Sequence, residues 1–384
     1  MSNIRIIPVT TRKGLRAFVN FYYELYKGNK FAVPFLRFDE MNTLSKHKNP
    51  AFEFCEAQYF LAVNHEARIV GRVAAIINRR ANEQWNKKQV RFGWFDFVDD
   101  LEVSQALLNA VEAWGRTKGM TECVGPLGFT DMDREGLLIE GFHHKSTMYI
   151  NYNYPYYKNH MEAMSFYEKD NDWLEYRIRV PEETPAKFAR TAEMIEKRYN
   201  LHVHKFTSRE LVKGGMGREV FHIVNETYKD LYDFQQLTDS QIDKYVNDYI
   251  KKADLNLVTG VVDGNDGNRL IGFGVSFPSF TDALQKIGNG KLLPWGWLKI
   301  LKVLKFHATD TVDLLVIGVL PEYRAKGANA LIFADLIEQY HRYGFKWAEA
   351  MPQMESNKGV QSQWQYLESE QHRRRRCYRK VMVR

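Results

Sequence analysis

Cysteine is scarce in this chain of 384 residues. The three cysteines, Cys55, Cys123 and Cys377, lie far apart, and no two of them form a Cys-x-x-Cys pair. An odd number of cysteines at such spacings argues against a disulfide framework and against a structural zinc site. We therefore expect reduced, buried thiols in a cytoplasmic protein, and we expect no metal.

Long apolar runs are also missing. No stretch approaches the roughly 20 apolar residues that a membrane-spanning helix needs. Residues 1–5 contain no apolar core of a signal peptide. We expect a cytoplasmic protein that does not cross a membrane, although contact with the inner face of the membrane stays open.

The length of the chain indicates how many domains it forms, and its charge indicates what kind of partner it binds. A chain of 384 residues is comfortable for two domains, and a hydrophobic content of 45% is normal for a globular protein. The formal net charge is +7. A basic balance suits an anionic partner, which can be a phosphorylated cofactor, a nucleic acid or an anionic membrane surface.

Both halves of the chain show the same order of predicted elements: a strand hairpin, a further strand, a loop, a helix and a closing strand. In the first half the strands are predicted at 58–63, 68–77, 92–98 and from 123, with a helix over 102–117. In the second half the strands are predicted at 255–262, 270–277, 312–319 and 347–351, with a helix over 328–342. The segment 181–185, Pro-Glu-Glu-Thr-Pro, reads as the boundary. We expect a mixed α/β fold of two domains, 1–180 and 181–384.

The segment 316–331 carries the most chemical information. An apolar strand stops at Pro321, a short basic loop follows, and a helix begins at once. Such a junction presents unpaired backbone N–H groups and the positive end of a helix dipole, which together favour a pyrophosphate. Gly327 allows close approach of the backbone, and Arg324 and Lys326 add positive charge.

These residues resemble the signature of the GNAT acyltransferase superfamily, in which a strand ending Val-x-Pro precedes Tyr-Arg-x-Lys-Gly and an apolar helix. The chain departs from the signature at Asn329, where the family usually has Gly or Ala. The resemblance implies two tandem GNAT-like domains, each with a mixed, mostly antiparallel sheet flanked by helices. It also implies a site for acetyl-CoA or a longer acyl-CoA, formed by the following residues: Ile317, Val319, Arg324, Ala325, Lys326, Gly327, Ala328, Asn329, Ala330 and Asn357.

The catalytic residues are less well marked. In GNAT folds an amine attacks the thioester directly, so the site needs a proton acceptor and a backbone N–H for the oxyanion. Ile317 or Val319 is the expected N–H donor. Asp313, in an apolar strand where burial would raise its pKa, and Glu355 are the candidate bases. Asn357, which follows Glu355 closely, either contacts the pantetheine arm of CoA or caps a helix.

The corresponding loop of the first half is acidic. Asp96, Asp99 and Asp100 surround the expected start of the helix, and such acids repel a pyrophosphate. We therefore expect no CoA site there and an acceptor-side role for the first domain. The glycine-rich segment 125–144 either lines an acceptor pocket or is a structural loop.

An insert at 280–308 bears on the acceptor. A helix from Trp297 would place apolar residues on one broad face, with Lys299, Lys302 and Lys305 on the other side and Trp295 just before it. A basic amphipathic helix with tryptophan is typical of a helix that lies on a membrane surface. The alternative is a helix packed on its own sheet with its lysines in water.

The insert reads Gly-Lys-Leu-Leu-Pro-Trp-Gly-Trp at 290–297, and an earlier loop reads Gly-Pro-Leu-Gly-Phe at 125–129. With these segments the whole chain resembles a group of bacterial tandem GNAT proteins, some of which are similar to bacterial ceramide synthases. That resemblance implies N-acylation of a long-chain, sphingoid amine; the alternative is acetylation of a small or peptide amine. Nucleic-acid binding is the rival from another class, because 372–376 reads His-Arg-Arg-Arg-Arg. However, 377–383 predicts that the run continues into a terminal strand.

Overall fold

The computed structural model describes residues 4–248 and 253–382, and these residues form two compact units. Unit 1 extends to Leu174 and also contains Phe280–Ile300 and the chain from His372 onward, whereas unit 2 contains Glu175–Ser279 and Leu301–Gln371. Two parts of the sequence predictions lie outside the described residues. They are residues 1–3, which belong to the N-terminal segment without an apolar core, and Val383, the last residue of the expected terminal strand.

The first break between the units falls after Leu174, a few residues before the expected boundary at 180, and two later segments also belong to unit 1. The C-terminal strand joins unit 1 because it pairs with an early strand, with Tyr378 opposite Gly125. The first part of the insert also joins unit 1, where the amide of Arg37 donates to Gly290 O at 2.9 Å. Pairing between residues far apart in sequence is a property of the fold, so element order alone did not reveal it.

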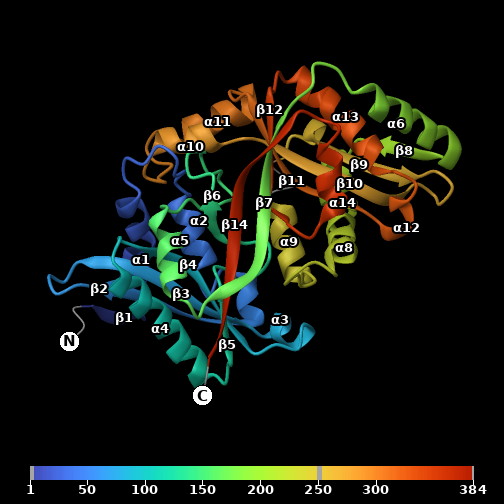
Figure 1. Cartoon of the computed structure of the whole chain (residues 1–384). Coiled ribbons are helices and arrows are strands. Elements are labelled where there is room, and N and C mark those ends of the chain that lie inside the picture. The colour runs from blue at the N-terminus through green and yellow to red at the C-terminus, as the bar shows by residue number, and fades with distance from the viewer. Residues whose placement is uncertain (1–3, 249–252, 383–384) are drawn as a thin grey trace. The chain divides into compact units, whose positions relative to one another are not determined.

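Unit 1 is a sheet with helices packed on it (Figure 1). Its strands run in the order β1-β2-β3-β4-β5-β14, and β6 pairs with β14. The elements up to β7 are β1 (Arg5–Val9), α1 (Arg12–Leu25), α2 (Arg37–Thr43), η1 (Pro50–Glu53), β2 (Cys55–Val63), β3 (Ile69–Asn78), α3 (Arg79–Gln84), β4 (Gln89–Phe97), α4 (Leu101–Thr117), β5 (Glu122–Gly125), β6 (Leu137–Glu140), α5 (Tyr156–Ala163) and β7 (Glu168–Arg179).

Unit 2 repeats the plan with the strand order β7-β12-β11-β10-β9-β8, and β13 pairs with β7. Strand β7 is shared between the units, as are α11 and β14. The remaining elements are α6 (Ala186–Tyr199), β8 (Leu201–His204), α7 (Ser208–Val212), α8 (Met216–Tyr228), α9 (Asp239–Asp248), η3 (Leu255–Leu257), β9 (Val258–Asp263), β10 (Arg269–Pro278), α10 (Thr281–Ile287), α11 (Gly296–Phe306), β11 (Thr311–Val319), α12 (Pro321–Arg324), α13 (Asn329–Arg342), β12 (Trp347–Ala350), β13 (Gln353–Met354), α14 (Lys358–Trp364) and β14 (Ser369–Val381).

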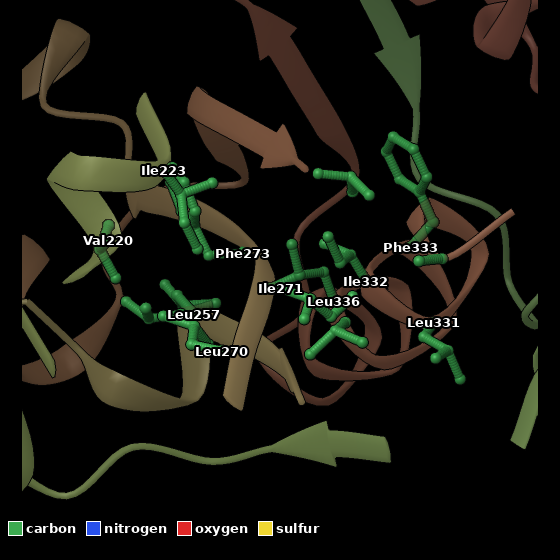
Figure 2. Close-up of a cluster of buried hydrophobic side chains, with 14 of the residues drawn as sticks. Val220, Ile223, Leu257, Leu270, Ile271, Phe273, Leu331, Ile332, Phe333 and Leu336 are labelled. Carbon is green, nitrogen blue, oxygen red and sulfur yellow. The ribbon is translucent and has the colours of Figure 1, made fainter. Parts of the chain in front are cut away.

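Helices cover both faces of the sheet in unit 2. Figure 2 shows Phe273 pointing toward Ile223 of α8, while Ile271 lies beside Ile332 of α13. A Cβ on Gly274 would come within 2.5 Å of Ile332, so α13 lies directly on β10 at that residue. This layered core holds β11 and the start of α13 in fixed positions.

In each unit a parallel ladder lies at the same place in the strand order. Strand β4 runs parallel to β5, and β11 runs parallel to β12, whereas the other registers recorded between strands are antiparallel. The mixed, mostly antiparallel sheets flanked by helices confirm the predicted fold class.

The arginine run lies inside β14 and does not form a basic surface. The side chains of Arg373 and Arg375 are almost fully buried. Arg376 binds the buried carboxylate of Asp172 with two bonds of 2.8 and 3.0 Å, and Arg374 adds a third at 3.0 Å. The run therefore serves the interior of unit 1 and lends no support to nucleic-acid binding.

All three cysteines are buried and reduced, as expected. Burial raises the pKa of Cys123 to about 12, so this thiol stays protonated and unreactive at neutral pH. No helix in the described part of the chain is both long and apolar enough to span a membrane.

Asp172 gives a test of the β14 arrangement. Burial alone would raise the pKa of Asp172, but the hydrogen bonds from Arg376 and Arg374 outweigh it and lower the pKa. Its stabilisation is therefore present above about pH 4 and is lost as the pH falls through the lowered native pKa. We expect Asp172→Asn to lower the free energy of unfolding by about 3 kcal/mol at pH 7, measured by urea denaturation.

The difference between wild type and Asp172→Asn should narrow below pH 4. A control is Glu193→Gln, which removes an exposed pair with Lys197 and should change little. A difference that is the same at pH 3 and pH 7 would show that the charge of Asp172 does not stabilise the strand.

Candidate functional site

Strand β11 separates from β12 halfway along its length. The parallel pairing runs from Thr311 to Leu314 and ends with a hydrogen bond from Met351 N to Leu314 O. At the same level the register with β10 shifts between Val275 and Ser276, which makes Leu315 an extra residue in β11. Such a bulge increases the local twist of a strand. The rest of β11, 315–319, therefore turns one open edge toward the gap.

Two backbone amides point into this gap. Leu320 N donates to Ile271 O at 2.9 Å, which sets the alternation of hydrogen bonds along the antiparallel pair. Because Leu320 faces β10, the peptide groups of Val319 and Ile317 face the opposite edge. Tyr228 OH donates to the carbonyl of Ile317 at 3.0 Å, and Arg324 Nε donates to that of Val319 at 3.1 Å. The N–H groups of the same two residues face the same open edge.

The loop after β11 leads directly to the N-terminus of α13. Gly327 has φ +79°, a conformation that other residues rarely adopt. Ala330 and Leu331 donate back to Gly327 and Ala328, so the first helical turn is tight. The N-cap residue is Ala328, whose side chain cannot cap, and no backbone acceptor is found among the described residues for its amide or for that of Asn329. An anion can therefore bind at this helix terminus without displacing a carboxylate of the chain.

The two basic residues of the loop have different surroundings. Arg324 spans the loop, because its guanidinium binds the carbonyls of both Val319 and Thr227 at 3.1 Å. Lys326 Nζ lies 4.3 Å from the centroid of the Tyr323 ring. Lys326 is thus the side chain better placed to follow an anion, while Arg324 holds the loop against β11 and α8.

The equivalent helix in unit 1 is capped by the chain itself. Asp100 Oδ1 accepts the amide of Glu102 at 2.9 Å. The backbone N–H and carbonyl of Phe97, at the end of β4, are both hydrogen-bonded: Tyr157 OH accepts from the N–H, and Tyr156 OH donates to the carbonyl. The anion position of α4 is therefore filled by a carboxylate, in line with the acidic loop in the sequence.

The glycine-rich loop of unit 1 borders a small cavity. The cavity measures about 30 Å³, enough for one or two water molecules and too small for a long-chain amine. One wall carries the buried ion pair between Arg72 and Asp96, at 2.6 Å. The lining residues are Arg72, Trp94, Phe95, Asp96, Pro126, Arg134, Gly136, Leu137, Asn151, Tyr152 and Asn153.

The remaining candidate residues of the reaction lie in three places. Asp313 is almost fully buried in β11. Asn357 is the N-cap of α14, and its Oδ1 accepts the amide of Val360 at 3.4 Å. Glu355 lies between them in the chain, partly exposed, and its carbonyl accepts from Gln361. The structure thus uses Asn357 as a helix cap, which was one of the two predicted roles.

Helix α11 divides its apolar residues between two sides. Val303 is buried, whereas Trp297, Leu298 and Leu301 are 43%, 36% and 36% exposed. The lysines also differ from the expectation that all three lie on the side away from the apolar face. Lys302 and Lys305 share the exposed side with Trp297 and Leu301, while Lys299 turns inward and donates to Lys286 O. The exposed side is therefore both apolar and basic, and Trp295, which is 70% exposed, adjoins it.

Sequence reasoning missed three residues that shape the gap. Tyr228 reaches Ile317 from α8, and Arg177 and Glu349 form an ion pair at 3.4 Å beside the start of the gap. Each lies far in sequence from its partner. No local motif could have identified them, because the contacts exist only in the folded sheet.

Comparison with solved structures identifies this arrangement. The chain aligns over 99% of its length with 99% of a tandem GNAT protein from the clavulanic acid biosynthesis pathway, at a TM-score of 0.56 and 11% identity. A GCN5-related N-acetyltransferase from Sphaerobacter thermophilus aligns over 98% of this chain and 96% of its own, at a TM-score of 0.52 and 13% identity. This chain has the tandem GNAT fold.

Two curated proteins are similar to this tandem GNAT chain in sequence. Protein YghO of Escherichia coli is 26% identical over 380 residues, which cover 96% of this chain and 93% of that protein. A bacterial ceramide synthase of Caulobacter vibrioides is 24% identical over 374 residues, covering 94% and 92%. No family model matches the chain.

The self-capped helix of unit 1 can be tested through stability. Asp100→Ala removes the acceptor of the Glu102 amide, so the free energy of unfolding should fall by about 1 kcal/mol, measured by urea denaturation. Asp100→Asn keeps a side-chain oxygen and should retain most of the stability. Equal losses in both variants would mean that the cap is not what Asp100 contributes.

Proposed function

We propose that this protein is an acyl-CoA-dependent N-acyltransferase whose CoA site is the β11–α13 loop of unit 2. One observation carries the proposal: α13 has no side-chain cap at the end of a splayed strand, whereas the equivalent α4 is capped by Asp100. The same architecture thus leaves one anion position open and closes the other. The GNAT fold supplies the class of ligand, an acyl-CoA thioester.

The residues of unit 2 suit the parts of this co-substrate. The amides of Ala328 and Asn329 suit the pyrophosphate, with Lys326 beside them. The gap beyond Leu314 suits the pantetheine arm, which is long, narrow and rich in amide groups. The N–H groups of Ile317 and Val319 suit the thioester carbonyl, whose oxygen gains negative charge during acyl transfer.

The reaction needs only one proton acceptor from the protein. The amine nitrogen attacks the thioester carbon, the new C–N bond forms, and the C–S bond breaks when the tetrahedral intermediate collapses. The amine gives up one proton and the departing CoA sulfur takes one. We assign the first role to Asp313, which is buried in the strand that carries the oxyanion donors. Glu355 is the second candidate.

The acceptor we favour is a long-chain amine of the sphingoid type. Two observations support it: the similarity to a bacterial ceramide synthase over 94% of this chain, and the exposed apolar and basic side of α11. Tryptophan and leucine suit the interface of a bilayer, and Lys302 and Lys305 suit anionic headgroups. We propose that α11 brings the protein to an anionic membrane surface from the cytoplasm. A small or peptide amine is the alternative acceptor.

The CoA site predicts the effect of one substitution. Gly327→Glu adds bulk and negative charge at the anion position, so the affinity for CoA should fall at least about 100-fold, measured by isothermal titration calorimetry. The wild type should bind one CoA per chain, because α4 offers no second site.

Gly344→Glu is the matched control for this substitution. Gly344 also has a positive φ, +71°, so both variants carry similar backbone strain, but Gly344 lies beyond the other end of α13. Gly344→Glu should bind CoA normally. Unchanged affinity in a folded Gly327→Glu protein, or two CoA per chain in the wild type, would contradict the proposed site.

The α11 surface predicts a separate effect. Trp297→Glu with Leu301→Glu should abolish flotation with phosphatidylglycerol vesicles and leave CoA affinity unchanged, because the exposed side would repel an anionic bilayer. Binding of the wild type should weaken as salt is added.

A double variant with glutamates at two exposed apolar residues away from α11, Met194→Glu with Phe166→Glu, is the control and should still float. Wild-type protein that stays with the soluble fraction at low salt, and acylates hexylamine faster than sphinganine, would favour the small-amine alternative.

A further inference from the structure

Three charged side chains form a row across adjacent strands of unit 2. Asp313 of β11 lies opposite Glu349 of β12, and Glu349 lies opposite Arg177 of β7. Residues opposite one another in a sheet project to the same face, about 5 Å apart. Arg177 Nε lies 3.4 Å from Glu349 Oε1, and the guanidinium also covers the ring of Trp347 at 4.3 Å.

The row lies where the gap between β11 and β12 begins, one residue before their last pair, Leu314 with Ala350. It also lies on the sheet face away from α13. Asp313 is opposite Phe277, which shares its face with Phe273. A Cβ on Gly318 would approach Phe273 and Ile223, so this is the face that α8 covers. A substrate amine that reaches the gap from this face meets the row.

The exposure of the three charged side chains increases along the row from Asp313 to Arg177. Asp313 is 1% exposed, the Glu349 side chain 14% and the Arg177 side chain 37%. Burial and a neighbouring carboxylate both make a carboxylate hold a proton more tightly, whereas a nearby guanidinium has the opposite effect. The three residues therefore combine opposing influences on the most buried member, Asp313.

Other titratable groups on the packed elements complete the surroundings. Glu175, buried, follows the same face of β7 two residues before Arg177. On α8, Tyr228 donates to Ile317 O, and Arg218 pairs with Asp239 and Asp243 of α9. The other titratable residues of α8 are exposed: Glu219, His222 and Glu226. Asp233, in the segment after this helix, is buried. Among the described residues, Glu349 and Arg177 are the charged side chains that continue the row from Asp313.

We propose that Glu349 and Arg177 are positioning residues that set the proton affinity of Asp313, the group that takes the proton from the acceptor amine. This inference rests on the proposed acyl transfer. The carboxylate of Glu349 strengthens proton binding by Asp313, and Arg177 limits this effect by holding Glu349. The proton passes from the amine nitrogen to Asp313 and is later released to solvent.

Substitutions of the two positioning residues should move the acid limb of the pH profile of kcat/KM in opposite directions. Glu349→Gln removes the neighbouring negative charge and should move the limb about one pH unit lower. Arg177→Met leaves that charge uncompensated and should move it about one unit higher, and Arg177→Lys should restore it. Asp313→Asn should lose at least about 100-fold in kcat. Suitable substrate pairs are palmitoyl-CoA with sphinganine and acetyl-CoA with hexylamine.

An exposed ion pair elsewhere on β7 gives the control. Arg179 lies 3.6 Å from Glu368, and Arg179→Met or Glu368→Gln should leave the limb in place. Because an acceptor must be found for kinetics, the titration of Asp313 should also be followed by NMR of 13C-aspartate-labelled protein. The signal is assigned by its loss in Asp313→Asn, and its midpoint should move in the same two directions.

The outcomes separate this inference from the proposed function. If the wild type does not bind CoA in calorimetry, the proposed function fails. If CoA binds but both variants move the Asp313 midpoint in one direction, or neither moves it, the positioning role is overturned while the CoA site stands.

Discussion

The central constraint on this structure is that peptide groups at the edge of a strand need partners. Strand β11 loses β12 after Leu314, so its outer edge would expose unpaired backbone groups inside the fold. The protein satisfies the carbonyls of Ile317 and Val319 with Tyr228 and Arg324. In the proposed site, the accompanying N–H groups serve the thioester carbonyl. The gap thus depends on α8 and on the loop before α13, which supply these two side chains.

The same requirement explains how two similar units come to differ. Both contain a parallel strand pair followed by a helix, and both helices begin with amides that lack internal acceptors. In unit 1 Asp100 supplies the acceptor, and the hydroxyls of Tyr156 and Tyr157 hydrogen-bond to the backbone carbonyl and N–H of Phe97. In unit 2 alanine stands at the N-cap of α13, so the N-cap side chain supplies no acceptor. The capping carboxylate of Asp100 therefore distinguishes the start of α4 from the start of α13.

Whether the net charge of +7 can attract an anionic partner depends on where the basic residues lie. The densest basic segment, 372–376, lies in β14, where two of its guanidiniums share Asp172. On α11, by contrast, Lys302 and Lys305 are exposed beside Trp297 and Leu301. Buried charges are compensated within the protein, so only the exposed ones can attract an anionic partner. The α11 surface is therefore the more informative basic feature, although its sequence is less charged.

The sequence by itself determined the mixed α/β class, the repeated order of elements and the loop from Val319 to Leu331. Each of these depends on local patterns: alternation in strands, helical spacing, and a proline and glycine that punctuate a turn. Only the tertiary structure decided that β14 joins unit 1, that α11 shows apolar residues on two sides, and that Asn357 caps α14. It alone brought Arg177, Glu349 and Asp313 into one row. The place of β14 and the charged row depend on strand pairing between residues far apart in the sequence, and such pairing leaves no periodic signal in the chain.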